Sequence, residues 1–386
     1  MTAFEVNAGD NGLVANNPTA AANNAQVIAN CFNLAPRVYL PDGQTYYTQD
    51  FAVPTSAKKL FGAAKLIPAG TISQAALVNI SGTEGFVSED TSILVPTSMT
   101  NLAAVGISGG AIGTELRRLM LSGEFGVLGG QATDTLVDHC VVTGYSNRGF
   151  YFTGSTKVRM RDSECSGGIA SAAHCYSCDP GTTEVYISRR RAVSSPVFGF
   201  ALNGVVYFEI EGCTSTDSMF EGINVTDSVY GQIIRNRLTF PQGKSVDFGM
   251  SFASVGGQCV DISIVGNVVD YPGKCCLAFA GNVGNVRRIV ATGNVLNSPW
   301  SKANVGGQTD PSGLYAAVVM YGPGTSDIEV MNNEIRDLAS NMRTKVGEQN
   351  VSGWPSNNRL GPNRSATSPF PNVTDNVVGP NSLGYT

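Results

Sequence analysis

The phrase ISIVGNVV at residues 262–269 is followed by IVATGNVL at 289–296 and by IEVMNNEI at 328–335. Each copy carries short, mostly β-branched apolar residues, an Asn at its sixth position and a further apolar residue after it. A shorter version, IIRNRL, precedes them at 233–238. Brief alternating segments rich in β-branched residues, each ended by a turn residue, predict strands rather than helices. This stretch of the chain is therefore expected to repeat one strand–turn–strand unit.

Weaker copies extend the repeat toward the N-terminus. The shared position is occupied by Cys140, Ser163, Arg190, Cys213, Asn236, Asn267, Asn294 and Asn333, at intervals of 23 to 39 residues. Repeats of this length indicate a solenoid, in which each coil buries its apolar side against its neighbours. Asn tolerates left-handed backbone geometry, and its amide can bond to the next Asn along a stack. The sequence thus predicts an all-β, right-handed, single-stranded parallel β-helix.

The composition is consistent with many short strands and argues against some classes of binding partner. The 386 residues include 45 Gly and only 14% charged residues, as tight turns and buried strands require. A net charge of −5 argues against binding to a nucleic-acid backbone. No segment approaches the roughly 18 apolar residues of a membrane helix, so we expect no membrane insertion. The first residues lack the pattern of a signal peptide. For the extracellular or virion-associated location that we expect, either the numbering starts at a mature end or the protein leaves its cell by another route, such as lysis.

The nine Cys are interpreted as buried thiols for the most part. Cys175 and Cys178 form a C-x-x-C pair beside His174, but no second Cys/His pair at metal spacing accompanies it. We therefore predict no metal and no cofactor. His139 is expected to make a structural hydrogen bond.

The repeat pattern fades toward both ends of the chain, which divides the chain into three segments. Residues 1–37 comprise an irregular segment and, from 18 to 35, a short amphipathic helix that would cover the open end of the solenoid. The parallel β-helix is expected over 38–340. Residues 341–386, rich in Pro, Asn, Ser and Gly, are expected to form an irregular tail that packs on the helix or on a neighbouring subunit.

The entry to the repeat carries a recognisable motif. After the candidate helix come Val38, Leu40, Pro41, Gly43 and Tyr46, a strand and turn leading into another strand. This succession resembles the entry segment of the pectate-lyase-like β-helix superfamily, which includes polysaccharide lyases, β-helical glycosidases, fructotransferases and phage tailspike depolymerases. The resemblance implies a parallel β-helix that acts on carbohydrate, and it says little about the chemistry.

A second strand in each coil is expected to present a binding face. Alternation would place one residue of each strand outward, and these are Tyr151, Tyr176, Ala201, Asn224, Ser251 and Ala278. Two positions earlier we expect a row on the same face consisting of Gly149, His174, Gly199, Gly222, Gly249 and Cys276. Bare glycine backbone would let an extended ligand approach, and stacked tyrosines would contact sugar rings. An equally good interpretation is that these glycines only allow the tight turns at the start of each strand and contact no ligand.

Charged residues gather just ahead of these strands. Glu221 and Asp247 lie within one position of each other on adjacent coils, and Asp217 is a third acidic candidate. Because parallel strands lie about 4.8 Å apart, the two carboxyl groups could be about 5 to 9 Å apart, which spans the geometries of retaining and inverting glycosidases. These acids are the candidate catalytic residues, although acids in such turns can also serve only to solvate the surface. The candidate substrate-binding residues are Tyr151, Tyr176, His174, Arg148, Asn224, Lys244 and Lys274.

The sequence thus favours a tailspike-like depolymerase that cleaves a poly- or oligosaccharide with a carboxylate pair. A polysaccharide lyase remains open, because Arg148, His174, Lys244, Lys274 and Tyr176 could supply the cations and the base that β-elimination needs. A fructotransferase and a purely adhesive or structural spike also remain open. The analogy with tailspikes suggests a homotrimer.

Overall fold

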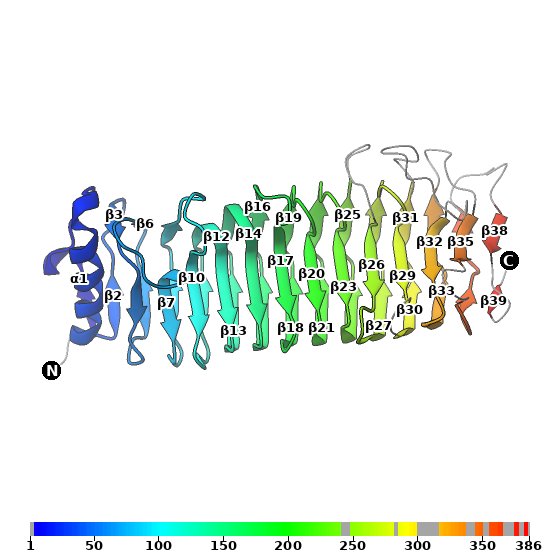
Figure 1. Cartoon of the computed structure of the whole chain (residues 1–386), viewed down its shortest axis with the longest axis horizontal. Coiled ribbons are helices and arrows are strands. Elements are labelled where there is room, and N and C mark those ends of the chain that lie inside the picture. Colours follow the sequence, from blue (N-terminus) through cyan, green and yellow to red (C-terminus); the bar gives the residue numbers. More distant parts are fainter. Residues whose placement is uncertain are drawn as a thin grey trace. The chain divides into compact units, whose positions relative to one another are not determined.

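The chain is a parallel β-solenoid, as the repeat predicts. The computed structural model describes residues 4–240, 248–281, 285–298, 316–336, 344–349, 355–365, 374–377 and 382–384. It divides into two compact units, residues 1–186 and 187–386. In both units the strands run from one coil to the next in parallel, and Figure 1 shows them succeeding one another along the chain.

In the N-terminal unit each coil contributes strands to one sheet, here called sheet A, and to two further runs, B1 and B2. Sheet A is made of β1 (Glu5–Asn7), β2 (Arg37–Tyr39), β5 (Lys59–Phe61), β8 (Val87–Glu89), β11 (Glu115–Arg117), β13 (Thr133–Asp138) and β15 (Thr156–Arg161). Run B1 contains β3 (Thr45–Thr48), β6 (Lys65–Pro68), β9 (Ser92–Leu94) and β16 (Glu164–Ser166). Run B2 contains β4 (Phe51–Val53), β7 (Ala76–Ser81), β10 (Ala103–Ser108) and β17 (His174–Asp179). The long strands β12 (Met120–Gly130) and β14 (Val141–Thr153) take part in both runs.

The C-terminal unit repeats this plan. Its sheet A contains β21 (Val206–Glu211), β24 (Val229–Ile234), β27 (Gln258–Val265), β30 (Asn285–Thr292), β33 (Thr325–Met331), β36 (Arg359–Leu360) and β39 (Leu383–Gly384). Run B1 continues through β19 (Arg191–Val193), β22 (Thr214–Thr216), β25 (Arg237–Thr239), β28 (Val268–Asp270), β31 (Val295–Asn297), β34 (Glu334–Arg336) and β37 (Arg364–Ser365). Run B2 continues through β20 (Phe200–Asn203), β23 (Ile223–Thr226), β26 (Met250–Ala253), β29 (Leu277–Ala280), β32 (Ala316–Tyr321), β35 (Thr344–Gln349) and β38 (Thr374–Val377). β18 (Thr183–Ser188) contains the boundary between the units.

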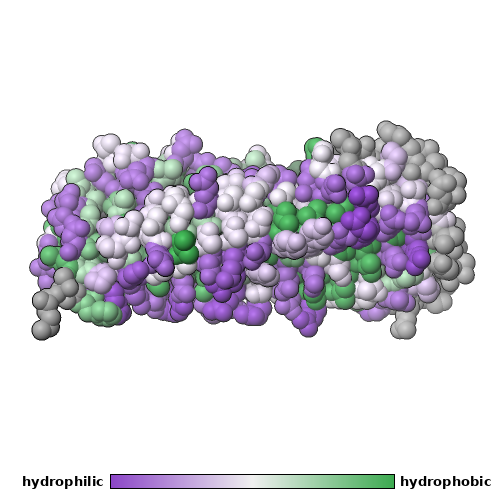
Figure 2. Space-filling model, turned by 90° about the horizontal axis from the view of Figure 1, so that it is seen from below, coloured by the Kyte–Doolittle hydropathy of each residue, from purple (hydrophilic) through white to green (hydrophobic). Residues whose placement is uncertain are grey.

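The core consists of one apolar side chain from every second strand position, stacked on its equivalent in the next coil. Phe252 and Phe279, for example, are fully buried with ring centroids 5.3 Å apart. Stacking of this kind is the way a coil without an independent core becomes stable. The surface seen in Figure 2 is mainly hydrophilic or intermediate, with apolar residues in small groups. Among the described residues, no helix has the length and apolar character that crossing a membrane requires.

The predicted N-terminal helix is confirmed as α1 (Ala21–Leu34). It lies beside β2 and β3 (Figure 1). Its buried side includes Ile28 and Phe32, and the Phe32 ring meets Phe86 with centroids 6.3 Å apart. Asn24 is buried as well, and its amide bonds to the backbone of Val14 and Tyr47. The helix therefore covers the first coil, which would otherwise expose its apolar interior.

The predicted asparagine stack is present in the C-terminal unit. The side-chain Nδ2 of Asn236 donates to Oδ1 of Asn267, which repeats the bond to Asn294, then to Asn333, and then to Asn363, over distances of 2.8–3.1 Å. Each Oδ1 also accepts the backbone N–H of the preceding Asn. The left-handed geometry, however, belongs to the residue before Asn236, Asn267, Asn294 and Asn333, such as Gly266 at φ 66°. The Asn is therefore selected for its amide.

The tail differs from the irregular segment that its composition predicts. In its described residues, β35 pairs with β32, β36 with β33 and β38 with β35, all in parallel. Asn363 continues the amide stack at the same place. Parallel pairing thus extends beyond residue 340, because backbone bonding needs no strong apolar pattern once a preceding coil offers a template. The N-terminal segment likewise contributes β1, which pairs with β2.

All nine Cys are buried free thiols. Burial raises the pKa of Cys178, and it raises that of Cys213 to about 12. Cys178 therefore stays protonated near neutral pH and fills core space.

We predict that Asn267→Ala lowers the free energy of unfolding by about 3 kcal/mol. Its buried amide bonds to Asn294 and to the carbonyl of Ile233, and its oxygen accepts two bonds from Asn236. Removing it leaves several buried groups unpaired, at about 1–3 kcal/mol each before relaxation. Chemical denaturation of the variant measures this loss. The exposed Gln232→Ala on sheet A is the control, and equal stability of the two variants would contradict a role for the stack.

Candidate functional site

The outward side of run B2 in the N-terminal unit carries an aromatic and basic cluster. Phe125, Arg148 and His174 occupy equivalent positions on β12, β14 and β17 and are all half-buried. Tyr151, three residues after Arg148, packs its ring against Phe125 with centroids 5.7 Å apart. Its hydroxyl donates to Oδ2 of Asp179 at 2.8 Å. These five residues are called the Arg148 cluster below.

The predicted partner of Tyr151 is not in this cluster. Tyr176 pairs with Phe150, is fully buried and stacks on that ring at 5.0 Å. Its hydroxyl donates to the carbonyl of Ser163. The prediction that Tyr176 faces outward is therefore wrong: Ser177 is the residue that pairs with Tyr151. The error is a one-residue shift in register, which moves every side chain of a strand to the other side.

The predicted row of outward glycines is also corrected. Gly149, Gly222 and Gly249 are buried, and each is followed by a buried apolar residue. A Cβ atom would collide with Cys165 at Gly149, with Leu238 at Gly222 and with Val269 at Gly249. These glycines therefore face the interior where run B1 approaches run B2 closely. They leave space for core side chains and offer no bare track for a ligand.

The electrostatics of the Arg148 cluster are shaped by burial. The Arg148 side chain donates from Nη1 to the backbone and side-chain oxygens of Asn147 and to the carbonyl of Ala172. Burial lowers the pKa of Arg148, and the charge of Asp179 partly offsets that effect. Burial, then Asp179, raises the pKa of Tyr151 to about 12. The cluster thus offers a held guanidinium, a neutral phenol and a neutral imidazole at pH 7.

His174 should stay neutral in the folded protein under mild acid. Burial, and then the Arg148 charge, lower its pKa to about 3, against about 6.5 in an unfolded chain. Between these values only the unfolded state binds the proton, so the free energy of unfolding decreases as pH falls from about 6.5 toward about 3. His174→Gln should remove up to about 1.4 kcal/mol per pH unit of that slope.

The chain has two His, so His139→Gln leaves one imidazole to follow by NMR. We expect its signal to stay in the neutral position from pH 8 to pH 5. A midpoint near 6.5 would contradict the burial of His174.

In the C-terminal unit, Glu221 and Asn224 lie on the outward side of run B2. Glu221, two residues before β23, is 6% exposed. Asn224 in β23 donates through Nδ2 to the hydroxyl of Ser251 at 3.0 Å, as the shared face predicts. Phe248 occupies the position equivalent to Glu221 in the next coil, and the ammonium of Lys274 lies 5.2 Å from its ring centroid.

The remaining acidic candidates are placed only in part. Asp217 is half-buried in the turn after β22, with φ 61°, and its Oδ2 accepts from the Ser194 hydroxyl at 3.3 Å. Asp247 and Lys244 lie outside the described residues. The separation of Glu221 and Asp247 therefore stays a prediction.

Some residues that the sequence did not single out belong to the Arg148 cluster or bond to its neighbours. Asp179 precedes Pro180 and Gly181, a combination that indicates only a turn, and Phe125 lies in a coil with weak periodicity. Glu124 accepts from Nδ2 of Asn147 and from the backbone N–H of Asn101. Only the register of β12, β14 and β17 brings these residues together, and no local motif marks them.

One group in the described residues has the composition of a metal site. Asp138, His139 and Asp162 place ligand-type atoms within 4.8 Å of one another. His139 Nδ1 contacts Asp138 Oδ1 at 2.9 Å, which is the structural hydrogen bond expected for it, and Arg161 binds the same carboxylate. The guanidinium already compensates that charge, so the group is best described as a surface ion-pair network.

Known structures share the fold. No protein-family model and no curated sequence matches the chain. The mannuronan C-5 epimerase AlgE6 A-module of Azotobacter vinelandii is 16% identical with a TM-score of 0.59, covering 98% of this chain and 97% of that one. The catalytic unit of a GH87 α-1,3-glucanase from Streptomyces thermodiastaticus is 14% identical with a TM-score of 0.55, covering 100% and 69%.

Tailspike protein 3 of bacteriophage CBA120 has a TM-score of 0.61 at 12% identity, over 98% of this chain and 62% of the tailspike chain. At such low identity these similarities establish the fold alone. The chain is a right-handed parallel β-helix protein, and this fold is shared by proteins that act on polysaccharides.

Proposed function

We propose that this protein binds a polysaccharide along the outward side of run B2 and hydrolyses it, as a tailspike-type depolymerase does. The observation that carries the proposal is Glu221, a carboxyl group only 6% exposed on the outward side of a regular coil. A surface carboxyl that merely solvates a turn would be open to water. The epimerase and the glucanase, both named for polysaccharides, support a carbohydrate ligand on this fold.

The proposed reaction uses Glu221 with a second carboxyl. Glu221 donates a proton to the glycosidic oxygen, and Asp247 or Asp217 either activates water or attacks the sugar carbon. Asp217 lies four residues before Glu221 in the same coil, whereas Asp247 belongs to the next coil in the sequence pattern. The side chains that would hold the sugar chain in this unit are Asn224, Lys274 and Lys244.

We predict that Glu221→Gln lowers the rate of cleavage by about 10²–10⁴-fold, the usual contribution of a general acid. The substitution keeps the shape and removes the transferable proton. Product analysis on a panel of neutral and anionic bacterial polysaccharides and fructans measures the rate, with mass spectrometry detecting fragments that carry one added water. Glu209→Gln, on sheet A, is the matched control. Unchanged cleavage in Glu221→Gln would contradict the mechanism.

A second candidate function, β-elimination on a uronate polymer, is favoured by the Arg148 cluster. A guanidinium that is held by Asn147 can neutralise a sugar carboxylate, and the neutral imidazole of His174 is the candidate base beside it, although its lowered pKa makes it a weak base. The phenol of Tyr151 would lie against the sugar. Tyr176, which the sequence assigned to this role, is excluded by its burial.

Elimination predicts a product that absorbs in the ultraviolet and is lighter by one water than the hydrolytic fragment. In that case Arg148→Gln abolishes the absorbing product, while Glu221→Gln retains it. Absorbance and mass followed together on a mannuronan substrate distinguish the two reactions. An absorbing product from the wild-type protein would exclude hydrolysis by the carboxylate pair.

Two further functions have distinct outcomes in the same assay. A cyclic difructose would identify a fructotransferase. Binding without any product, unchanged by replacement of Asp217, Glu221 and Asp247, would identify an adhesive spike. Assembly as a homotrimer and an extracellular or virion-associated location belong to the tailspike proposal and are tested by light scattering and by fractionation.

A further inference from the structure

A pocket of about 480 Å³ lies between two corner loops of the N-terminal unit, and its lining includes no residue of the Arg148 cluster and none of the acidic candidates. The first loop connects β6 to β7 and the second connects β9 to β10, so the loops belong to consecutive coils. The pocket is lined by Gly70, Ile72, Ser73, Gln74, Ser98, Met99, Thr100, Asn101 and Leu102. Its volume is within the range of pockets that hold small ligands.

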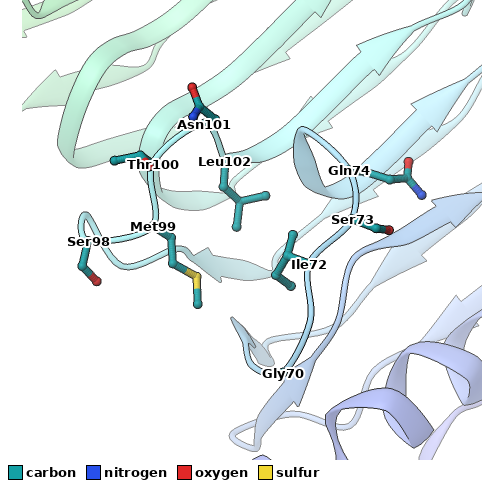
Figure 3. Close-up of a pocket in the computed structure, with 9 residues that line it drawn as sticks. All are labelled: Gly70, Ile72, Ser73, Gln74, Ser98, Met99, Thr100, Asn101 and Leu102. Atoms are coloured by element: carbon teal, nitrogen blue, oxygen red, sulfur yellow. The ribbon is translucent and has the colours of Figure 1, made fainter.

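The lining is chemically suited to a neutral sugar. In Figure 3 the side chains of Ile72, Met99 and Leu102 point into the space between the loops. Hydroxyl and amide side chains surround them, with Gln74 and Asn101 directed toward the margins (Figure 3), and no lining residue is charged. A sugar ring has an apolar C–H face and a rim of hydroxyls. It would place the face on the aliphatic side chains and the rim among the hydroxyls and amides.

Both loops are held by carboxylates that do not line the pocket. Asp50 accepts from the backbone N–H and the hydroxyl of Ser73, at 2.8 and 2.9 Å. Glu124 accepts from the backbone N–H of Asn101. Asn101 also adopts φ 60°, which fixes the turn into β10. The pocket is therefore preformed and would lose little entropy when it is filled.

The same hydrogen bonds connect the pocket to the Arg148 cluster. Glu124 bonds to Asn101 on one side and to Nδ2 of Asn147 on the other, and Arg148 donates to Oδ1 of Asn147 at 2.7 Å. Ala103, just after the pocket, pairs with Phe125, which pairs with Arg148. Ala103 and Arg148 are thus two coil steps apart, roughly 10 Å along the stack. A single extended sugar chain can span that distance.

We propose that this pocket is a distal carbohydrate subsite, which takes a neutral sugar residue of a chain that continues to Arg148 and Tyr151. The proposal rests on the proposed carbohydrate-binding function and extends it to a surface that no catalytic assignment includes. It makes the bound polymer mixed in character, because the pocket is uncharged and the Arg148 cluster presents a guanidinium to an acidic sugar. Glu124 would be the positioning residue that keeps the two parts in register.

The test measures binding to variants of the pocket. Met99→Asp and Ile72→Asp place a charge among the aliphatic side chains and leave Asp50 and Glu124 in place. We expect a dissociation constant about tenfold higher, and hence binding about 1.4 kcal/mol weaker, for long oligosaccharides from bacterial heteropolysaccharides that contain both neutral and uronate sugars. Ile112→Asp is the control, because Ile112 is apolar, 50% exposed and in the same unit but beside sheet A. All these variants are made in the Glu221→Gln protein, so that the oligosaccharide is not cleaved, and the affinity of the Ile112→Asp control should match that of Glu221→Gln alone.

Two readouts keep the result interpretable if a variant folds poorly. Gln74→Ala removes an exposed rim amide with little risk to the fold and should weaken binding in the same direction. Hydrogen exchange on the Glu221→Gln protein should show protection of residues 70–74 and 98–102 when the mixed oligosaccharides are added. Equal affinities across all variants, or no protection of these loops by any oligosaccharide, would overturn the subsite.

Failure of the subsite can be told from failure of the proposed function. Cleavage without protection of the pocket loops leaves the function and removes the subsite. Protection of those loops without any cleavage leaves the subsite and removes the hydrolytic function. A fall in the mass measured by light scattering for Met99→Asp, with oligosaccharide binding unchanged, would show that the pocket is a contact between copies of the chain and would overturn the subsite.

Discussion

The amide stack from Asn236 to Asn363 is the interaction on which the regularity of the C-terminal unit depends. Each stacked Asn from Asn236 to Asn333 donates to Oδ1 of the next Asn in the stack through both its side-chain Nδ2 and its own backbone N–H. Shifting one coil by a residue would break two bonds and bury their partners unpaired, which costs more than most apolar mismatches. The stack thus fixes the register of successive coils. That register determines which side chains run B2 turns outward, and therefore where a ligand can be recognised.

Recognition and rigidity are separated between the two sides of each strand in run B2. The inward side carries stacked aromatic rings such as Phe150 and Tyr176, together with glycines where the core is narrow. The outward side carries groups whose chemistry burial has modified, such as Arg148 and His174. Because the inward side is held by the packed core, the outward groups need no loop closure to stay in place. A face of this kind suits an extended polymer better than a compact metabolite.

Much of the fold could be predicted from the sequence, and the site only in part. The Asn at the sixth position of ISIVGNVV has few explanations apart from a stacked turn, and the capping helix follows from its apolar spacing. Which residues of run B2 face outward was harder to predict. Counting from Cys175 gave the wrong side for Tyr176, because the preceding loop has no fixed length and one residue inverts the pattern. The prediction of outward glycines is wrong for another reason. At the bend that precedes β23, Gly222 and Ile223 are both buried, so the inward–outward alternation of side chains does not extend back to the glycine. Glu124 and Asp179 acquire meaning only from contacts across coils, which no local motif encodes.

We propose that the outward side of run B2 is the surface that binds a polysaccharide. The most direct measurement is the crystal structure of the Glu221→Gln protein with the oligosaccharides that the wild-type protein binds. We expect sugar density along run B2, in contact with Tyr151 and Arg148 or with Asn224 and the substituted side chain at position 221. Sugar bound only on sheet A, with run B2 empty, would contradict it.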